Sequence, residues 1–195
     1  MTGASRGIGL AVATVTAQLG PPDILVNCAA KVNVGPMRDE DLDEHLNIKL
    51  KGYLRCARAF APGMAERGWG RIVNVSGLAA RQTGSVVGSV RNVAVAAMTK
   101  NLAHEYGPQG INVTVVHPGM TRTERTPDTL AAMAAARGCT PEEVEAAIAR
   151  GVDIGRIVTA EEVADVIAFL ASPRSVSITG DAVPVGGGVR GAIHY

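Results

Sequence analysis

Aromatic residues are scarce in this sequence and make up 3% of its 195 positions, whereas glycine occurs 23 times and hydrophobic residues reach 47%. The core must therefore be aliphatic and closely packed, as in a parallel sheet covered by helices. An excess of charge of either sign is also missing, because the formal net charge is +1. No electrostatic footprint points to nucleic acid or to a membrane surface, and we expect neither as a partner.

Cysteine is too sparse for a disulfide framework. Cys28, Cys56 and Cys139 are an odd number of thiols without metal or redox spacing, so we expect reduced cysteines in a cytoplasmic protein. The four histidines are scattered and form no ligand pattern, which predicts no metal site. Apolar runs of about 18 residues and a charged-then-apolar leader are missing too, so neither a membrane span nor a signal peptide is expected.

Strand and helix patterns alternate along the whole chain. Apolar runs bounded by turn residues predict buried strands at 23–30, 71–77, 111–119 and 178–185. Hydrophobic residues recur every three or four positions over 39–64, which predicts a long amphipathic helix, and a helix of small residues follows over about 85–106. Strands separated by helices predict a doubly wound α/β domain with a parallel sheet and right-handed crossovers.

Three helix starts are marked in the second half of the chain. Thr126 precedes a proline and is predicted to cap a helix. Thr140 with Glu143, and Thr159 with Glu162, have the spacing of capping boxes, in which threonine accepts from the N3 amide and glutamate reaches back. These signals predict that a helix pair lies within the segment 121–155.

A glycine-rich loop, TGASRGIG at 2–9, opens the chain and runs straight into a helix-like segment. Glycine has no Cβ, so backbone amides there can approach a pyrophosphate at a helix N-terminus. The loop alone does not separate this interpretation from an ordinary glycine-rich turn. It also matches the G-x-S-x-G elbow of α/β-hydrolases, but that elbow requires a preceding strand and an HGGG-like segment, and neither pattern is present.

Five segments in order carry a resemblance: TGASRGIG at 2–9, DILVNCAA at 23–30, GRIVNVSG at 70–77, NVTVVHPGMTRT at 112–123 and ITGDAVPVGGG at 178–188. Together they resemble the short-chain dehydrogenase/reductase family across nearly the whole chain. The resemblance implies one Rossmann-like domain over 1–195, in which 121–155 forms a substrate lid. It also implies alcohol–carbonyl hydride transfer to or from NAD or NADP on a small-molecule substrate, and a homodimer or homotetramer.

The same resemblance implies a set of cofactor contacts. The glycine loop would meet the pyrophosphate, the end of the 23–30 strand would pack beside the adenosine, and the turn after the 111–119 strand would meet the nicotinamide carboxamide. The residues so placed are Gly3, Ser5, Arg6, Gly7, Ile8, Gly9, Asn27, Ala29, Pro118, Gly119, Thr121 and Thr123.

The family's catalytic tyrosine and lysine have no counterpart. Aligning the helix end MTKNLAHEYG at 98–107 puts the tyrosine position at Gly88 and the lysine position at Asn92. Neither side chain donates a proton with a pKa near neutrality. No tyrosine of the sequence has a lysine four residues later. Orthodox chemistry of the family is therefore not expected.

The family's serine and asparagine are displaced as well. The serine position falls on Gly77, with Ser76 one residue earlier, and the asparagine position falls on Lys49. Ser76 replaces the serine only where the backbone is irregular, because successive strand residues point to opposite faces. Candidate catalytic residues are therefore Ser76, Asn92 and Lys49. Lys49 and four further side chains would either line the cleft as an acid or anion clamp or lie on the surface: Tyr53, Arg81, Arg91 and Arg122.

The cofactor site departs from the family pattern too. An acidic residue is expected about 20 residues after the glycines, to grip the ribose hydroxyls, but this count reaches Ala29 and Ala30. The family's second and third strands have no counterpart, so NAD and NADP are not distinguished, although Arg6 suggests a 2′-phosphate. These gaps leave three hypotheses: an altered oxidoreductase, a non-catalytic binding or assembly module, and a chain lacking its first strand and a block after about Ala13.

Overall fold

The computed structural model describes residues 20–30 and 39–190, and the strands in them form a parallel sheet in the order β1-β2-β3-β6. These strands are β1 (Ile24–Asn27), β2 (Gly70–Val75), β3 (Ile111–Pro118) and β6 (Ala182–Val185). All three strand pairs are parallel, so the predicted parallel sheet is confirmed. Each strand is shorter than its apolar run, because the flanking residues form the turns that leave the sheet.

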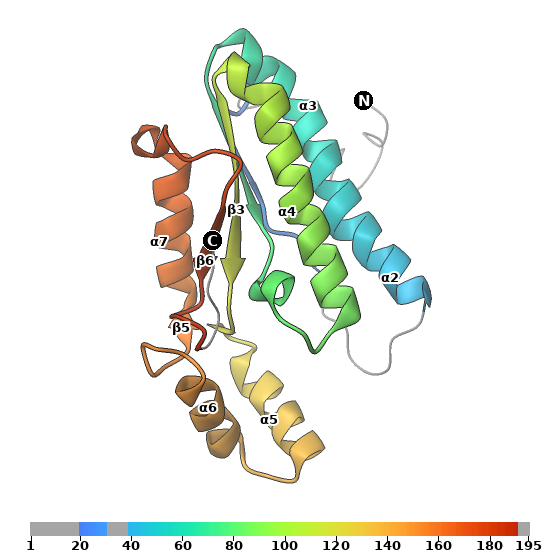
Figure 1. Cartoon of the computed structure of the whole chain (residues 1–195), viewed down its shortest axis with the longest axis vertical. Coiled ribbons are helices and arrows are strands. Elements are labelled where there is room, and N and C mark those ends of the chain that lie inside the picture. Colours follow the sequence, from blue (N-terminus) through green and yellow to red (C-terminus); the bar gives the residue numbers. More distant parts are fainter. Residues whose placement is uncertain (1–19, 31–38, 191–195) are drawn as a thin grey trace.

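Helices cover both faces of the sheet, as predicted for a doubly wound domain (Figure 1). Helices α3 (Gly52–Glu66) and α4 (Val86–Tyr106) pack on one face, and α7 (Ala160–Ala171) packs on the other. Side chains alternate across a strand, so Ile72 joins the core under α3 and α4 while Val73 joins the core under α7. Short 3₁₀ turns complete these layers at η2 (Leu78–Arg81), η3 (Gly107–Gln109) and η4 (Pro173–Ser175).

The predicted long helix is present, but its middle is widened. It consists of α2 (Asp39–His45), a six-residue π-helical segment η1 (Leu46–Lys51) and α3. The hydrophobic spacing indicates a helix but does not distinguish α from π geometry, so the widening escaped prediction. Lys49 lies inside the π-helical segment and is buried.

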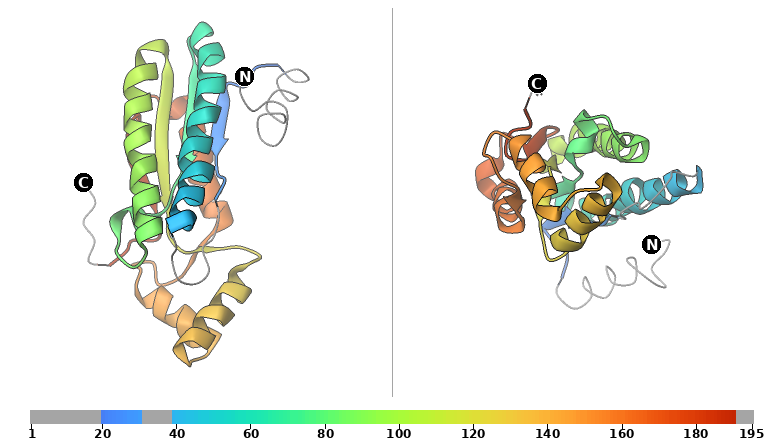
Figure 2. Two further views of the ribbon diagram at one scale, coloured as in Figure 1. Left: turned by 90° about the vertical axis from the view of Figure 1, so that its right-hand side faces the viewer. Right: turned by 90° about the horizontal axis from the view of Figure 1, so that it is seen from below.

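A separate helix pair lies beyond the carboxyl ends of the strands (Figures 1 and 2). It consists of α5 (Thr126–Arg137) and α6 (Pro141–Arg150), which pack around Leu130, Ala134 and Val144. Two short strands connect the pair to the rest of the domain, because β4 (Thr121–Arg122) pairs with β5 (Val158–Thr159). The sequence predicted the helices and missed these two strands, which are too short to show a pattern.

Two of the three predicted helix caps are confirmed. Thr140 Oγ1 accepts from Glu143 N at 3.2 Å while Glu143 Oε2 accepts from Thr140 N at 2.8 Å, and the box of Thr159 and Glu162 has the same form. The prediction for Thr126 is wrong, because Thr126 is the first residue of α5. Its hydroxyl is taken by the preceding turn, where it accepts from Thr123 N at 2.8 Å.

One edge of the sheet is open within the described ranges. β1 is an end strand, and no described strand pairs with its outer side. Ile24 and Val26 on it are 44% and 41% exposed, unlike the residues of β2, which are all buried. None of the helices in these ranges combines the length and the apolar character needed to cross a bilayer.

Candidate active site

The carboxyl ends of three neighbouring strands bring the predicted site residues to one edge of the sheet. Asn27 ends β1, Ser76 follows β2, and Pro118 ends β3 with Gly119 after it. Ligands of doubly wound proteins bind in the crevice outside this edge. The structure therefore places these residues where the fold favours a site.

Lys49, Ser76 and Asn92 are brought together from three different elements. Lys49 Nζ donates to the Ser76 carbonyl at 2.9 Å, and Ser76 Oγ donates to the Asn92 carbonyl at 3.1 Å. Asn92 Nδ2 donates in turn to the Gly77 carbonyl at 3.4 Å. All three side chains are buried. The cluster thus holds one ammonium group against the end of β2.

The ammonium of Lys49 is destabilised where it lies. Burial and, to a smaller extent, the guanidinium of Arg91 together lower the pKa of Lys49 to about 8, and Cys28 opposes this shift. An acid is most effective when its pKa lies near the working pH. Lys49 is therefore suited to proton transfer, in contrast to an exposed lysine.

Tyr53 is a structural residue of this edge. Its hydroxyl lies 2.9 Å from the Ala29 carbonyl and 3.0 Å from the Val75 carbonyl, joining the ends of β1 and β2. Burial raises the pKa of Tyr53, and Cys28 adds to the shift. A phenol so disposed does not give up its proton near neutrality.

The arginines proposed for the cleft have different environments. Arg91 is half-buried, and its Nη1 lies 2.8 Å from Nδ1 of His45. Burial lowers the pKa of Arg91, although a guanidinium remains charged. Arg122 pairs with Glu145 on α6 and is exposed. Arg81 ends the η2 turn and is partly exposed. Of the three, Arg91 is the one close enough to act on Lys49.

A cavity of about 210 Å³ lies between the carboxyl edge of the sheet and α6, and its described lining does not include Lys49, Ser76 or Asn92. Gly119, Gly151 and Gly186 contribute backbone to its wall, and Gln82 and Arg156 contribute polar side chains. The remaining lining is aliphatic and comes from Leu78, Met120, Ile148, Val152, Ile157 and Val189. This composition is typical of a pocket for a small organic molecule.

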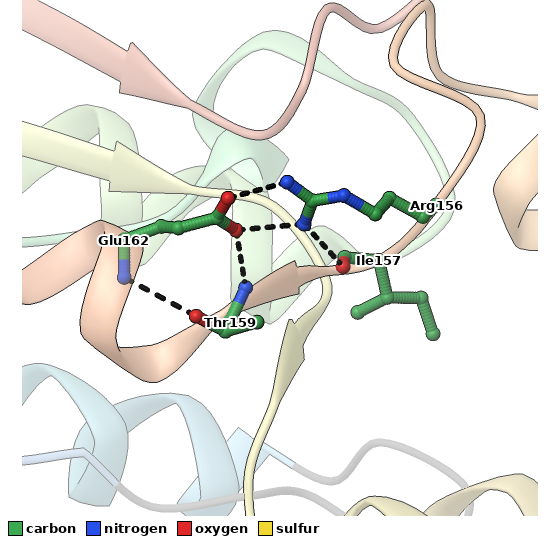
Figure 3. A network of polar contacts seen from close by, with 4 residues as sticks. All are labelled: Arg156, Ile157, Thr159 and Glu162. Carbon is green, nitrogen blue, oxygen red and sulfur yellow. Dashed lines mark hydrogen bonds and ion pairs between the residues drawn. The ribbon is translucent and has the colours of Figure 1, made fainter.

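Arg156 is held at the cavity wall by Glu162 (Figure 3). Its Nη1 donates to Glu162 Oε2 at 2.8 Å and its Nη2 donates to Glu162 Oε1. Glu162 also accepts from Thr159 N at 2.8 Å. The hydrogen bonds from Arg156, with that of Thr159, lower the pKa of Glu162 to about 2.

The structure describes only some of the residues that were predicted to contact the cofactor. Gly3, Ser5, Arg6, Gly7, Ile8 and Gly9 lie outside the described residues. Asn27 Nδ2 donates to Asn74 Oδ1 at 2.9 Å, and Thr121 Oγ1 donates to the Gly119 carbonyl at 3.1 Å. Thr123 Oγ1 accepts from Arg125 N, Ala29 is exposed, and Gly119 follows Pro118, the last residue of β3.

These residues fit one half of a dinucleotide. At the carboxyl edge, backbone of Gly119 and Gly186 lines the cavity, and a Cβ on Gly119 would come within 3.0 Å of the Gly186 Cα, so side chains are excluded there. The nicotinamide end fits such a surface. For the adenosine end, the described residues offer no strand on the outer side of β1.

Four parallel strands with helices on both faces and a cavity at the carboxyl edge define a Rossmann-like α/β protein. The family model described as enoyl-(acyl carrier protein) reductase matches residues 4–190. The short-chain reductase protein NovJ of Streptomyces niveus is 35% identical over 201 aligned positions, which cover 95% of this chain and 75% of that protein. The 3-oxoacyl-[acyl-carrier-protein] reductase FabG of Pseudomonas aeruginosa is 32% identical, over 88% of this chain and 67% of that one.

Solved structures agree with this assignment. L-Sorbose reductase of Gluconobacter frateurii, complexed with NADPH and L-sorbose, superposes with a TM-score of 0.85 at 26% identity, over 93% of this chain and 72% of that chain. A 3-oxoacyl-[acyl-carrier protein] reductase of Brucella melitensis with bound NAD gives 0.77 at 27% identity, over 93% and 67%. The chain belongs to the short-chain dehydrogenase/reductase family of oxidoreductases.

Sequence reasoning missed two features of this site. Tyr53 was considered only as an acid or a surface residue, although helical spacing already puts it on the apolar face with Ala57 and Ala61. The contact of Arg156 with Glu162 was also missed. The sequence does contain a sign of this contact, because a basic residue stands six positions before the glutamate of the capping box. Spacing alone does not show, however, that the two side chains turn toward each other.

Proposed function

We propose that this protein is an NAD(P)-dependent oxidoreductase that interconverts a carbonyl compound and an alcohol, with Lys49 in place of tyrosine as the proton donor. The observation that carries the proposal is the buried ammonium of Lys49 at the carboxyl end of β2, with a pKa lowered to about 8. General acids contribute most when they are protonated at the working pH yet release the proton readily.

A bound nicotinamide supplies the hydride that reaches the carbonyl carbon. The turn at Pro118 and Gly119 would hold the nicotinamide end. In reduction, the carbonyl oxygen gains the electron pair of the broken π bond and takes the proton of Lys49 Nζ, which leaves a neutral amine. Arg91 favours this neutral amine, because its own positive charge lowers the pKa of Lys49. The Ser76 carbonyl keeps Nζ in place at 2.9 Å.

The relatives support a carbonyl substrate but do not name one for this chain. Two of them are named for their action on L-sorbose and on 3-oxoacyl groups. Because Gly88 and Asn92 replace the family's tyrosine and lysine, we expect turnover well below that of enzymes with the usual pair. We further propose a cytoplasmic location, which the free Cys28, Cys56 and Cys139 support.

Titration with NADH and NADPH tests this proposal at its first step. Nucleotide fluorescence is expected to change saturably for at least one of the two at submillimolar concentration. Slow oxidation of that nucleotide is then expected with L-sorbose or acetoacetyl-coenzyme A as the carbonyl probe. Binding of neither nucleotide at millimolar concentration would rule the proposal out.

The second candidate function is a non-catalytic assembly module, and one surface favours it. Val86, Val90 and Val93 lie on one face of α4 at helical spacing and are 62%, 45% and 50% exposed. We propose that this stripe forms a homodimer or homotetramer contact, which both candidate functions allow.

Val93→Asp is expected to convert the oligomer to a monomer in sedimentation velocity, because a carboxylate would be buried without a partner at the contact. Val176→Asp is the matched control, since Val176 is 68% exposed and lies outside α4. A wild-type protein that sediments only as a monomer contradicts the proposed assembly.

A further inference from the structure

The cavity at the carboxyl edge is walled mainly by aliphatic carbon. Leu78 approaches it from η2, Met120 and Ile157 approach from two loops, and Ile148 approaches from α6. Apolar walls of this kind are complementary to apolar ligand groups. The aliphatic lining by itself thus indicates a hydrocarbon group, and the remaining question is whether the cavity also selects by charge.

Arg156 is the one charged side chain among the described residues of the lining. A free guanidinium there would attract carboxylates and phosphates, which arginine binds through paired hydrogen bonds. Both terminal nitrogens of Arg156 are instead directed to the two carboxylate oxygens of Glu162 (Figure 3). The geometry that would recognise an anionic ligand is already occupied by a residue of the protein.

Glu162 is fixed independently of Arg156. It is the N3 residue of α7, and its carboxylate accepts from Thr159 N at 2.8 Å in the capping box. Its carboxylate is therefore held at the first turn of the helix and does not have to be ordered by the arginine.

The capping box alone does not explain why Arg156 pairs with Glu162. Glu143 closes the same kind of box at α6, where its carboxylate accepts from Thr140 N at 2.8 Å. No arginine contact accompanies that glutamate in the described part of the chain. Arg156 is therefore not required for a capping box, and its pairing with Glu162 needs another explanation, which its position at the cavity provides.

We propose that Glu162 neutralises Arg156 at the cavity wall and thereby makes the cavity a site for uncharged aliphatic ligands that excludes carboxylates. This inference rests on the proposed function in taking the cavity as the place of the carbonyl substrate. It assigns the substrate class: a neutral ketone, aldehyde or alcohol with an aliphatic body.

Ligand binding without any nucleotide tests this assignment. The protein is labelled with ¹³C at its methionine methyl groups, and spectra are recorded with cyclohexanone and with cyclohexanecarboxylate as probes. Met120 lines the cavity, whereas Met133 packs between α5 and α6 and serves as the internal reference. We expect a saturable shift of the Met120 signal with cyclohexanone and binding of the carboxylate weaker by about 10-fold or more, equivalent to about 1.4 kcal/mol.

Glu162→Gln is expected to raise the affinity for cyclohexanecarboxylate about 10-fold, because the charge of Arg156 is then no longer cancelled. Cyclohexanone affinity should change less than about 2-fold, since it depends on apolar contact. Glu143→Gln is the matched control: it alters the same capping chemistry at α6, and it should leave the selectivity unchanged.

Arg156→Lys provides a second variant should Glu162→Gln fail to fold. Lysine cannot bridge both carboxylate oxygens, so a smaller gain in carboxylate affinity is expected. Equal wild-type affinity for the two probes, no shift of Met120 with either, or a carboxylate affinity unmoved in the variants would overturn the assignment. Each of these results is independent of NADH or NADPH binding, so failure of the charge selection and failure of the proposed oxidoreductase function are told apart.

Discussion

Lys49→Met is expected to lower the rate of nucleotide-dependent carbonyl reduction by about 100-fold or more, the usual contribution of a general acid. Methionine keeps most of the aliphatic stem but has no proton to give. Wild-type turnover should fall as the pH rises through about 8, because the acid must be protonated to act and the pKa of Lys49 is lowered to about 8. The measurement is kcat between pH 6 and 10 for both proteins.

Arg58→Met is the control for this experiment, since Arg58 is an exposed cation on α3, the helix that follows the π-helical segment. Its turnover and its pH profile should match those of the wild type. Equal turnover of Lys49→Met and wild type across the range would show that the proton comes from another group.

The Lys49→Met variant also tests whether the buried charge of Lys49 destabilises the folded protein, through the pH dependence of the free energy of unfolding. The folded pKa of Lys49, about 8, lies below its ordinary value of 10.5, so the unfolded chain binds more protons between these limits. The free energy of unfolding should therefore rise with pH across this window, by on the order of 3 kcal/mol from this residue. Below pH 8 the full cost of the buried charge is present.

Urea denaturation of both proteins from pH 7 to 10.5 measures this effect. Other groups titrate alike in both proteins, so the difference between the two curves isolates Lys49. As the pH rises, the free energy of unfolding of the wild type should increase relative to that of Lys49→Met. Parallel curves would mean that the ammonium carries no such cost in the folded state.

Gly110→Ala is expected to lower the free energy of unfolding by about 3 kcal/mol or more. Gly110 has a φ of +82°, and a Cβ added there would lie 2.1 Å from the Gly68 carbonyl oxygen. The obstacle is backbone and cannot rotate away. The two turns that begin β2 and β3 are joined at this point, because Gly70 N donates to the Gly110 carbonyl at 3.3 Å.

Gly138→Ala separates the cost of the left-handed backbone conformation from the cost of the contact between the added Cβ and backbone. Gly138 also has a positive φ, +65°, but a Cβ there meets nothing within 4 Å. The left-handed conformation alone costs an alanine about 1 kcal/mol. Urea denaturation of the two variants should therefore differ by about 2 kcal/mol or more, and equal destabilisation would refute the backbone contact.

Most of the fold was predictable because it depends on local patterns. Short apolar runs gave the four strands of the main sheet, and the reciprocal threonine and glutamate spacing located the starts of α6 and α7. Thr126 was misassigned because a hydroxyl can serve either a helix end or the preceding turn, and only the tertiary path of the chain decides between them.

The site was less predictable, because its contacts join residues far apart in the sequence. The sequence placed Ser76 and Asn92 near the family's catalytic positions, but it did not show that both would be bonded to backbone carbonyls. The lowered pKa of Lys49 depends on burial and on Arg91, which is on another helix. Such effects follow from packing in three dimensions and leave no pattern in the chain.

The π-helical segment at Leu46–Lys51 has a consequence for how this chain tolerates change. A π turn holds more residues than an α turn, so removing a single residue from it would restore ordinary α geometry. Because the extra residue is the one removed, α2 before the deletion and α3 after it would keep their facing relative to each other, and the change would be confined to the segment itself. Lys49 lies in this segment and donates to the Ser76 carbonyl, so a one-codon deletion should displace Lys49 while leaving the packing of α2 and α3 largely in place. The additional residue therefore serves the placement of this ammonium group rather than the alignment of the two helices.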